Sequence, residues 1–142
     1  MASPGTVTLG KLALGVAVPA SGQNATTPGE VPLATLADIA QTSVFTRGGS
    51  VLVWYGASGN LNKSISGVVP IIVSVSNNAG LMREHILNLE TTGFVAPWSV
   101  MGVKTEQPSA SGRLYTLRAI YSGTSPDVFR VESAYLVAME LA

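Results

Sequence analysis

Short runs of β-branched and aromatic residues, broken about every ten residues by Gly, Pro, Asn or Ser, extend over most of this sequence. In several runs apolar residues alternate with small or polar ones, which is the period of a half-buried β-strand. Helix periodicity is confined to residues 36–39, where Thr35 could cap a single turn. We therefore predict an all-β fold, a jelly roll or β-sandwich of about eight strands.

The expected strands begin and end at turn residues. Asn77-Asn78-Ala79-Gly80 predicts the turn of a hairpin, and Pro70 marks an edge or a bulge. Ser58-Gly59-Asn60 is expected to end the strand before it. The expected strands cover residues 12–18, 50–57, 68–76, 81–90, 94–103, 113–121 and 128–141.

The N-terminal segment differs in composition from the rest. Gly, Ser, Thr, Ala and Pro dominate it, Lys11 is its one basic residue, and no acid precedes Glu30. We predict an extended N-terminal arm over residues 1–30 and a jelly-roll domain over residues 31–142. The arm is expected to add a strand to its own sheet or to a neighbour's. The expected partner-binding residues are the apolar side chains that alternate with small ones: Leu12, Leu14, Val16 and Val18.

The same stretch faintly resembles a secretory signal, because Lys11 precedes it and Pro19-Ala20-Ser21 follows. The apolar part is short and is interrupted by Gly15, so we expect no signal. No run approaches the ~18 uninterrupted apolar residues of a membrane-spanning helix, and we expect no membrane partner.

Charge is scarce, at 11% of residues against about 25% in ordinary globular proteins. Eight basic and eight acidic residues cancel, which protects poorly against self-association. This composition fits either a common drift in β proteins or a surface that lies against other chains. No basic run is present, so we expect no nucleic-acid partner. The absence of cysteine excludes disulfides and thiolate metal sites.

Candidate catalytic groups are few. His85 is the one histidine, and a Ser-His-Asp triad would have to use it with Asp38 or Asp127. Its charged neighbours in the predicted strand favour a solvent-facing or interface position, and we expect His85→Ala to change stability by less than about 1 kcal/mol. No Gly-x-Ser-x-Gly elbow is present. We therefore expect no catalytic residue and no enzyme activity.

Binding sites for ions and cofactors are not indicated either. The acids are scattered singly, whereas calcium needs several oxygens in one loop, so we expect no metal and no cofactor. Glu132 and Glu140 have the same strand parity and could share one face, but more than ~20 Å of strand would separate them. Arg47-Gly48-Gly49-Ser50 precedes a strand rather than a helix and predicts a turn, not a phosphate loop.

Aromatic residues leave two alternatives open, a sugar-binding platform or packing in the core and at subunit interfaces. Their scatter and their places within apolar strands favour packing. The residues concerned are Trp54, Tyr55, Trp98, Tyr115, Tyr121 and Tyr135.

Four stretches carry a resemblance to a known family. They are residues 45–53 (Phe-Thr-Arg-Gly-Gly-Ser-Val-Leu-Val), 57–59 (Ala-Ser-Gly), 115–119 (Tyr-Thr-Leu-Arg-Ala) and 136–141 (Leu-Val-Ala-Met-Glu-Leu). Over about two-thirds of its length the chain resembles the tumour-necrosis-factor/C1q-like jelly-roll modules of phage head-decoration and fibre proteins. The resemblance implies an oligomer that packs through its sheets and carries no catalytic site.

These observations together predict a virion structural protein. We expect a capsid decoration, or cement, protein that binds the outside of a phage head and stabilises contacts between major capsid subunits. Its expected partners are itself, as a homo-oligomer with a trimer favoured over a dimer, and the major capsid protein. It would be made in the host cytoplasm and reside on the capsid surface of the virion. The alternatives are another phage structural part (head fibre, tail or baseplate component) and a carbohydrate-binding or adhesin-type module.

Overall fold

The computed structural model describes residues 29–64, 67–89, 95–107 and 111–141, which consist of strands and their connections. The strands are β1 (Gly29–Val31), β2 (Ala37–Thr46), β3 (Val51–Asn62), β4 (Ile71–Asn77), β5 (Gly80–Leu87), β6 (Val95–Glu106), β7 (Ser111–Tyr121) and β8 (Val128–Glu140).

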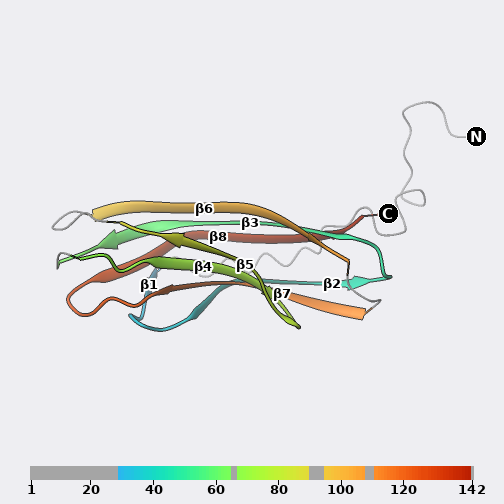
Figure 1. Ribbon diagram of the computed structural model, residues 1–142, viewed down its shortest axis with the longest axis horizontal. Coiled ribbons are helices and arrows are strands. Elements are labelled where there is room, and N and C mark those ends of the chain that lie inside the picture. Colours follow the sequence, from blue (N-terminus) through green and yellow to red (C-terminus); the bar gives the residue numbers. More distant parts are fainter. Residues whose placement is uncertain (1–28, 65–66, 90–94, 108–110, 142) are drawn as a thin grey trace, which may run out of the picture.

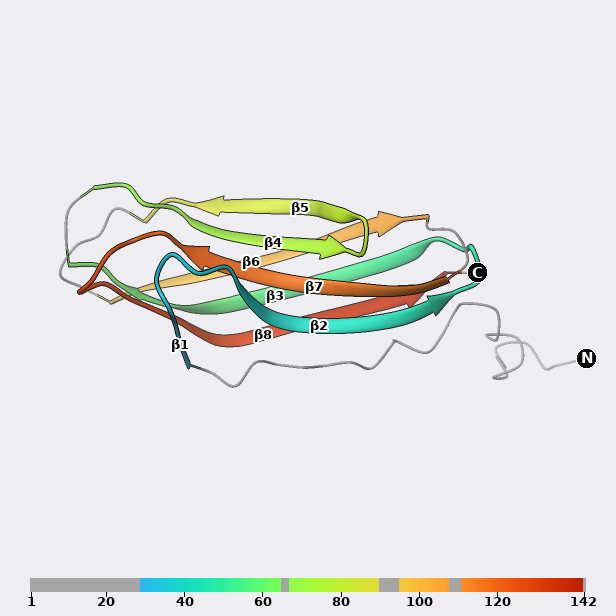
Figure 2. The same cartoon turned by 90° about the horizontal axis from the view of Figure 1, so that it is seen from below.

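The strands form two antiparallel sheets that stack face to face (Figures 1 and 2). Sheet A has the order β1-β8-β3-β6, and sheet B has the order β2-β7-β4-β5. The pairing is nested, since β1 pairs with β8, β2 with β7, β3 with β6 and β4 with β5. A long antiparallel hairpin rolled into two sheets has this topology, which is that of a jelly roll. The predicted fold class is confirmed.

The core lies between the sheets and is built by strand alternation. Every second residue of β3, β4 and β7 points inward, and the largest fully buried side chains are Tyr55, Tyr115, Tyr121 and Phe129. The Phe129 ring contacts the rings of Trp98 and Tyr121, with centroids 5.4 Å and 5.9 Å away. Burying each large apolar side chain stabilises the fold by roughly 1.5–3 kcal/mol.

The expected helical turn at residues 36–39 is wrong, because this segment leads into β2. A bulge between Asp38 and Ala40 shifts the register of β2 against β7, and Ile39 and Ala40 are consequently both buried. Two adjacent inward residues break the two-residue period, so this strand is hidden from a search for alternation.

The expected end of a strand at Ser58-Gly59-Asn60 is also wrong, because β3 continues to Asn62 between β6 and β8. Gly59 is needed here for space rather than for a turn. A Cβ on Gly59 would lie 1.9 Å from the carbonyl oxygen of Arg130. The Asn77–Gly80 hairpin turn is confirmed, and Asn77 Oδ1 accepts hydrogen bonds from the N–H groups of Ala79 and Gly80.

The predicted domain boundary falls inside a strand of the sandwich. Gly29 and Glu30 belong to β1, which pairs with residues 130 and 131 of β8. Residues 1–28 of the predicted arm lie outside the described residues.

The turn between β2 and β3 is held by a buried carboxylate. Glu140 Oε1 accepts hydrogen bonds from the backbone N–H groups of Arg47 (2.8 Å) and Gly49 (2.7 Å). Gly48 in this turn has φ +97°, which favours glycine. The predicted turn is confirmed, and its N–H groups bind a side chain of β8.

We expect Glu140→Ala to lower the free energy of unfolding by about 1–3 kcal/mol, because two partly buried backbone donors lose their acceptor. Glu140→Gln keeps the acceptor oxygen and should cost less. Urea denaturation measures both, with Glu84→Ala, an exposed carboxylate on β5 without an ion-pair partner among the described residues, as the control expected within about 0.5 kcal/mol of wild type. Equal stability of Glu140→Ala and the control would contradict the role of this carboxylate.

Candidate interaction surfaces

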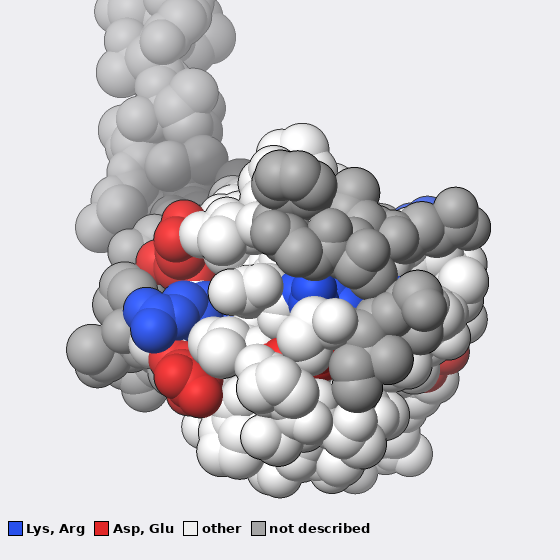
Figure 3. Space-filling view, turned by 90° about the vertical axis from the view of Figure 1, so that its left-hand side faces the viewer, with Lys and Arg blue, Asp and Glu red and all other residues white. Residues whose placement is uncertain are grey.

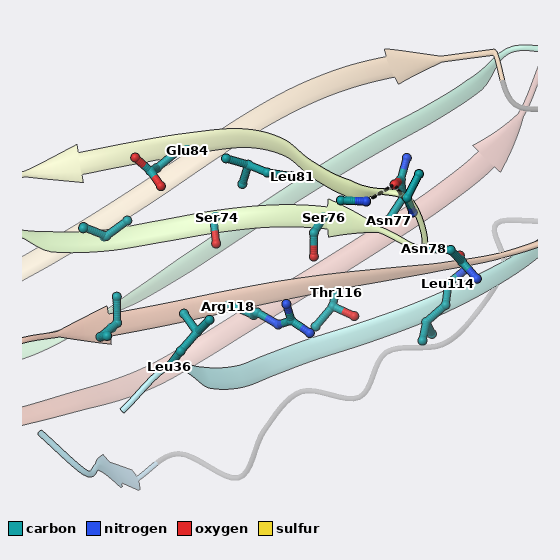
Figure 4. A pocket seen from close by; sticks show the side chains of 14 residues that line it. Leu36, Ser74, Ser76, Asn77, Asn78, Leu81, Glu84, Leu114, Thr116 and Arg118 are labelled. Atoms are coloured by element: carbon teal, nitrogen blue, oxygen red, sulfur yellow. Dashed lines mark hydrogen bonds between the residues drawn. The ribbon is translucent and has the colours of Figure 1, made fainter. Parts of the chain in front are cut away.

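The outer face of sheet B is hollowed into a groove of about 760 Å³, which we call the sheet B groove (Figure 4). The residues of β4 that point inward are Ile and Val. The residues that alternate with them and point outward include the small side chains Ser74 and Ser76. Longer side chains flank them on both sides. Ser74 lies between Glu84 and Arg118, and Ser76 pairs across with Leu81 on β5 and Thr116 on β7. A middle strand of small residues between strands of larger ones makes the face concave.

The rim of the sheet B groove is apolar. Leu36, Leu81 and Leu114 are 51%, 63% and 43% exposed and line the same groove, so they form an apolar patch rather than isolated surface leucines. Ile72 and Ile120 also line the groove. A partner that covered this face would bury these side chains, and their burial would favour binding.

The groove contains one balanced and one unbalanced charge. Arg118 Nε lies 2.7 Å from Asp38 Oδ1, so this guanidinium is paired. Glu84 is exposed, and it forms no ion pair with the part of the chain that the structure describes. The groove therefore offers one unpaired negative charge beside an apolar rim.

The outer face of sheet A carries a second, shallower hollow of about 300 Å³, which we call the sheet A patch. Trp54, Met101, Val103 and Tyr135 line it, and all four project from the same face because Trp54 pairs with Val103, and Gly56 with both Met101 and Tyr135. A Cβ on Gly56 would lie 2.5 Å from the Tyr135 ring, so the missing side chain lets this ring lie flat over β3. Met101 is 76% exposed and Val103 is 53% exposed.

The six aromatic residues considered from the sequence divide between core and surface. Tyr55, Tyr115, Tyr121 and Trp98 are buried, as the packing alternative predicts. Trp54 and Tyr135 are half-buried on the sheet A patch. Their position depends on which residues of β3 and β8 face outward, and sequence alternation identifies this for Trp54 but not for Tyr135, which follows a bulge.

His85 faces the core rather than solvent, so the solvent-facing alternative is wrong. His85 Nε2 lies 2.7 Å from the hydroxyl of the buried Tyr55, and the two rings meet edge to face with centroids 5.7 Å apart. Burial and the nearby Arg83 guanidinium lower the pKa of His85. Burial also raises the pKa of Tyr55. The pair joins β5 of one sheet to β3 of the other.

The two aspartates considered as triad partners are engaged elsewhere. Asp127 is buried and accepts hydrogen bonds from the Tyr121 hydroxyl (2.7 Å) and from both the N–H (2.9 Å) and the hydroxyl (2.7 Å) of Ser64. Asp38 pairs with Arg118. The structure therefore does not assemble the triad from these residues.

A third tyrosine contact uses Glu106, which the sequence analysis did not single out. Glu106 Oε1 accepts a 2.5 Å hydrogen bond from the Tyr115 hydroxyl, and its other oxygen accepts one from the Asn77 amide. Burial and Glu106 together raise the pKa of Tyr115. The contact pins the β4–β5 turn, at one end of the sheet B groove, to β6.

Glu132 and Glu140 do not share a face. A bulge in β8 opposite Ser58 and Gly59 inserts Glu132 between Val131 and Ser133, so Glu132 is exposed while Glu140 is buried. No group of three or more His, Cys, Asp or Glu among the described residues could hold a metal ion. Within the same residues, no helix is both long and apolar enough to cross a bilayer. The expected partner-binding residues Leu12, Leu14, Val16 and Val18 lie outside the described residues.

We expect His85→Ala to lower the free energy of unfolding by about 1–3 kcal/mol, because the buried Tyr55 hydroxyl loses its partner. This replaces the smaller effect expected from the sequence. Glu84→Ala, the exposed neighbour on the same strand, is the matched control. The pKa of His85 in the folded protein lies below the ordinary 6.5, so the stabilisation by His85 should be lost as the pH falls below that value. His85→Gln has no titrating group at this position and should not show this loss. Thermal unfolding at pH 7.5 and 5.5 measures this loss, and an identical pH response of wild type and His85→Gln would contradict it.

Acid should also weaken the Asp127 contacts. Burial alone would raise the pKa of this carboxyl, but the hydrogen bonds from Ser64 and Tyr121, together with Lys63, hold it below its ordinary 3.8. A depressed pKa gives stability that is present above 3.8 and lost as the pH falls through the folded value. The stability advantage of wild type over Asp127→Asn should therefore shrink from pH 6 to pH 3. Glu84→Gln, at an exposed carboxylate without an ion-pair partner among the described residues, is the control, and a constant advantage over this range would contradict the assignment.

Comparisons with known proteins find matches among solved structures. No family model matches the sequence, and no curated protein matches it. A pentameric capsid protein from metagenomic phage sequences is 22% identical, with a TM-score of 0.32 over 99% of this chain and 78% of that one. A structure of infectious bursal disease virus, Gx strain, is 10% identical (TM-score 0.28, 86% of this chain and 38% of that one), and a VP2 subviral particle of the same virus is 11% identical (TM-score 0.25, 88% and 40%). Alignments with TM-scores this low do not establish a shared function.

Proposed function

We propose that this chain is a structural protein of a virus particle, and more narrowly a decoration, or cement, protein on the outside of a phage head. One observation carries the proposal: both outer faces of the jelly roll present hollows lined by exposed apolar side chains. Leu81 and Leu114 lie on one face, and Met101 and Val103 on the other. A sandwich with two such faces suits a place between other chains.

The scarcity of charge supports the same role. At the end of the sandwich seen in Figure 3, charged atoms form small separate patches on a mostly uncharged surface. With charged residues at 11% of the chain, few like-charge repulsions oppose close packing of copies. Many weak contacts of one kind, repeated over a shell, stabilise it through avidity.

The jelly-roll topology is compatible with this role, since the fold occurs in viral capsid and lectin domains. Fold alone does not decide between these uses. The resemblance to tumour-necrosis-factor/C1q-like modules favours a trimer over a dimer as the assembled form, with the major capsid protein as the second partner. In this proposal the N-terminal arm, through Leu12, Leu14, Val16 and Val18, provides attachment to a neighbouring chain.

A carbohydrate-binding module is the second candidate, and one observation favours it. Trp54 and Tyr135 line the same hollow of the sheet A patch, and aromatic rings at a surface can stack on sugars. Glycan binding that is abolished by Trp54→Ala, without any particle binding, would favour this candidate over the structural role.

We expect the purified protein to be an oligomer at micromolar concentration, measured by light scattering coupled to size exclusion. A 14.6 kDa monomer at high micromolar concentration would contradict the proposal. Purified protein added to phage heads that lack it should bind to them and sediment together with them. Replacing Leu12, Leu14, Val16 and Val18 by Ser should leave the melting temperature nearly unchanged but remove most of the binding, because these residues are expected to contact the assembly and not the core.

The sheet A patch provides a paired test of the same proposal. Met101→Glu places a charge in an apolar contact and should weaken assembly or particle binding, whereas Thr105→Glu, exposed on the same strand, should not. Equal binding by both variants would remove the sheet A patch from the proposed interface.

A further inference from the structure

The sheet B groove has the length of a short extended peptide. Its lining runs along β4 from Ile72 to Asn77, six residues that span ~20 Å at strand spacing, and continues into the β4–β5 turn at Asn78. The apolar alternation of the arm, residues 12–18, is seven residues long. An extended segment of this length would fill the groove from one end to the other.

The groove also has the chemistry for such a segment. The rim of Leu36, Leu81 and Leu114 can bury the apolar face of an extended peptide. The floor of the groove can form hydrogen bonds with the backbone of such a peptide, because no hydrogen bond within the described residues engages the side-chain hydroxyls of Ser74 or Ser76. Hydroxyls at the floor matter because an extended peptide that docks on a face must find partners for its N–H and C=O groups.

Charge supplies a second match between the arm and the groove. Lys11 is the only charged side chain before Glu30, and it directly precedes Leu12. Glu84, on the β5 side of the groove, is the groove's one charge without an ion-pair partner among the described residues. The one cation of the arm therefore matches the one unpaired anion of the groove.

The direction of β1 indicates whose groove is filled. β1 is antiparallel to β8 and begins with Gly29 opposite Val131, so a chain extended backward from β1 would run toward the Glu140 end of β8. Ten residues, 19–28, separate Val18 from Gly29 and span at most ~36 Å. The nine residues of β8 after Val131 span ~30 Å, so a chain that continued straight in this direction would bring Val18 to the end of the sandwich, within reach of a neighbouring copy. Its own groove lies on the outer face of the other sheet.

We propose that the sheet B groove binds residues 11–18 of a neighbouring copy of this chain in an extended conformation, with Lys11 paired to Glu84. The proposal rests on the assembly role proposed above and names the site that receives the arm. The arm thereby links one copy to the next through a face of the sandwich.

Disulfide trapping tests this contact directly, because the chain has no cysteine of its own. Two single variants, Val16→Cys and Ser76→Cys, are mixed under reducing conditions, allowed to exchange and then oxidised. A mixed dimer should form about fivefold or more above that of Val16→Cys with Ser99→Cys, a control serine exposed on sheet A, because bound thiols meet at high effective concentration. Equal yields in the two mixtures would overturn the proposal. A single chain that carries both Val16→Cys and Ser76→Cys provides a second test. If this chain forms an internal disulfide while the mixture of single variants yields no mixed dimer, the arm occupies its own groove and the proposal is overturned.

Charge reversal tests the proposed pair of Lys11 and Glu84. Lys11→Glu and Glu84→Lys should each weaken self-association roughly fivefold at each contact, and the double variant should restore it, because the pair is re-formed with its signs exchanged. Lys104→Glu, exposed on β6, changes the net charge equally and should have no such effect. Sedimentation analysis of the full chain measures each dissociation constant, with melting temperatures to confirm folding. Failure of the double variant to recover would overturn the Lys11–Glu84 pairing.

These experiments use the protein without virus particles, so they separate the two proposals. Loss of the trapped dimer with retained particle binding would overturn the groove assignment alone. A trapped dimer without any particle binding would overturn the virion role and leave the groove contact standing.

Discussion

Three buried tyrosines between the sheets set the arrangement on which the rest of the structure depends. Tyr55, Tyr115 and Tyr121 fill the core with their rings, yet each carries a hydroxyl that needs a partner when water is excluded. The hydroxyls contact His85, Glu106 and Asp127 respectively, at 2.5–2.7 Å. Tyr55 of β3 with His85 of β5, and Tyr115 of β7 with Glu106 of β6, each join one sheet to the other. Tyr121 holds Asp127, in the loop before β8, against β7. The polar groups therefore fix the arrangement of a core that apolar packing alone would specify less tightly.

Several of the few titratable side chains serve the interior. The one histidine and two of the eight acids bind tyrosine hydroxyls, and Glu140 binds the turn between β2 and β3. These four side chains are engaged in structural contacts. What the outer faces present instead is apolar, in the sheet B groove and the sheet A patch, and both surfaces are suited to binding other chains.

Local periodicity accounts for the parts of the fold that could be predicted. The strands that became β4, β7 and β8 alternate strictly over most of their length, and the Asn77–Gly80 turn has the residues that a hairpin turn requires. Prediction failed where a bulge interrupts the period. Residues 37–40 of β2 have two adjacent inward residues, and Glu132 of β8 shifts parity so that Glu140 faces inward while Glu132 does not.

The sequence by itself determined the fold class, because the two-residue period and the turn residues are local properties that each segment carries. Only the tertiary structure decided which chemistry each polar residue serves. From the sequence, Gly59 is a turn residue, but in the structure the carbonyl of Arg130 leaves no room for a side chain there. From the sequence, His85 is a surface residue, but in the structure it contacts the hydroxyl of Tyr55. The sheet B groove likewise exists because Ser74 and Ser76 are flanked by residues five to ten and some forty positions further along the chain. Such neighbours are set by the register between strands, which no single segment of the sequence contains.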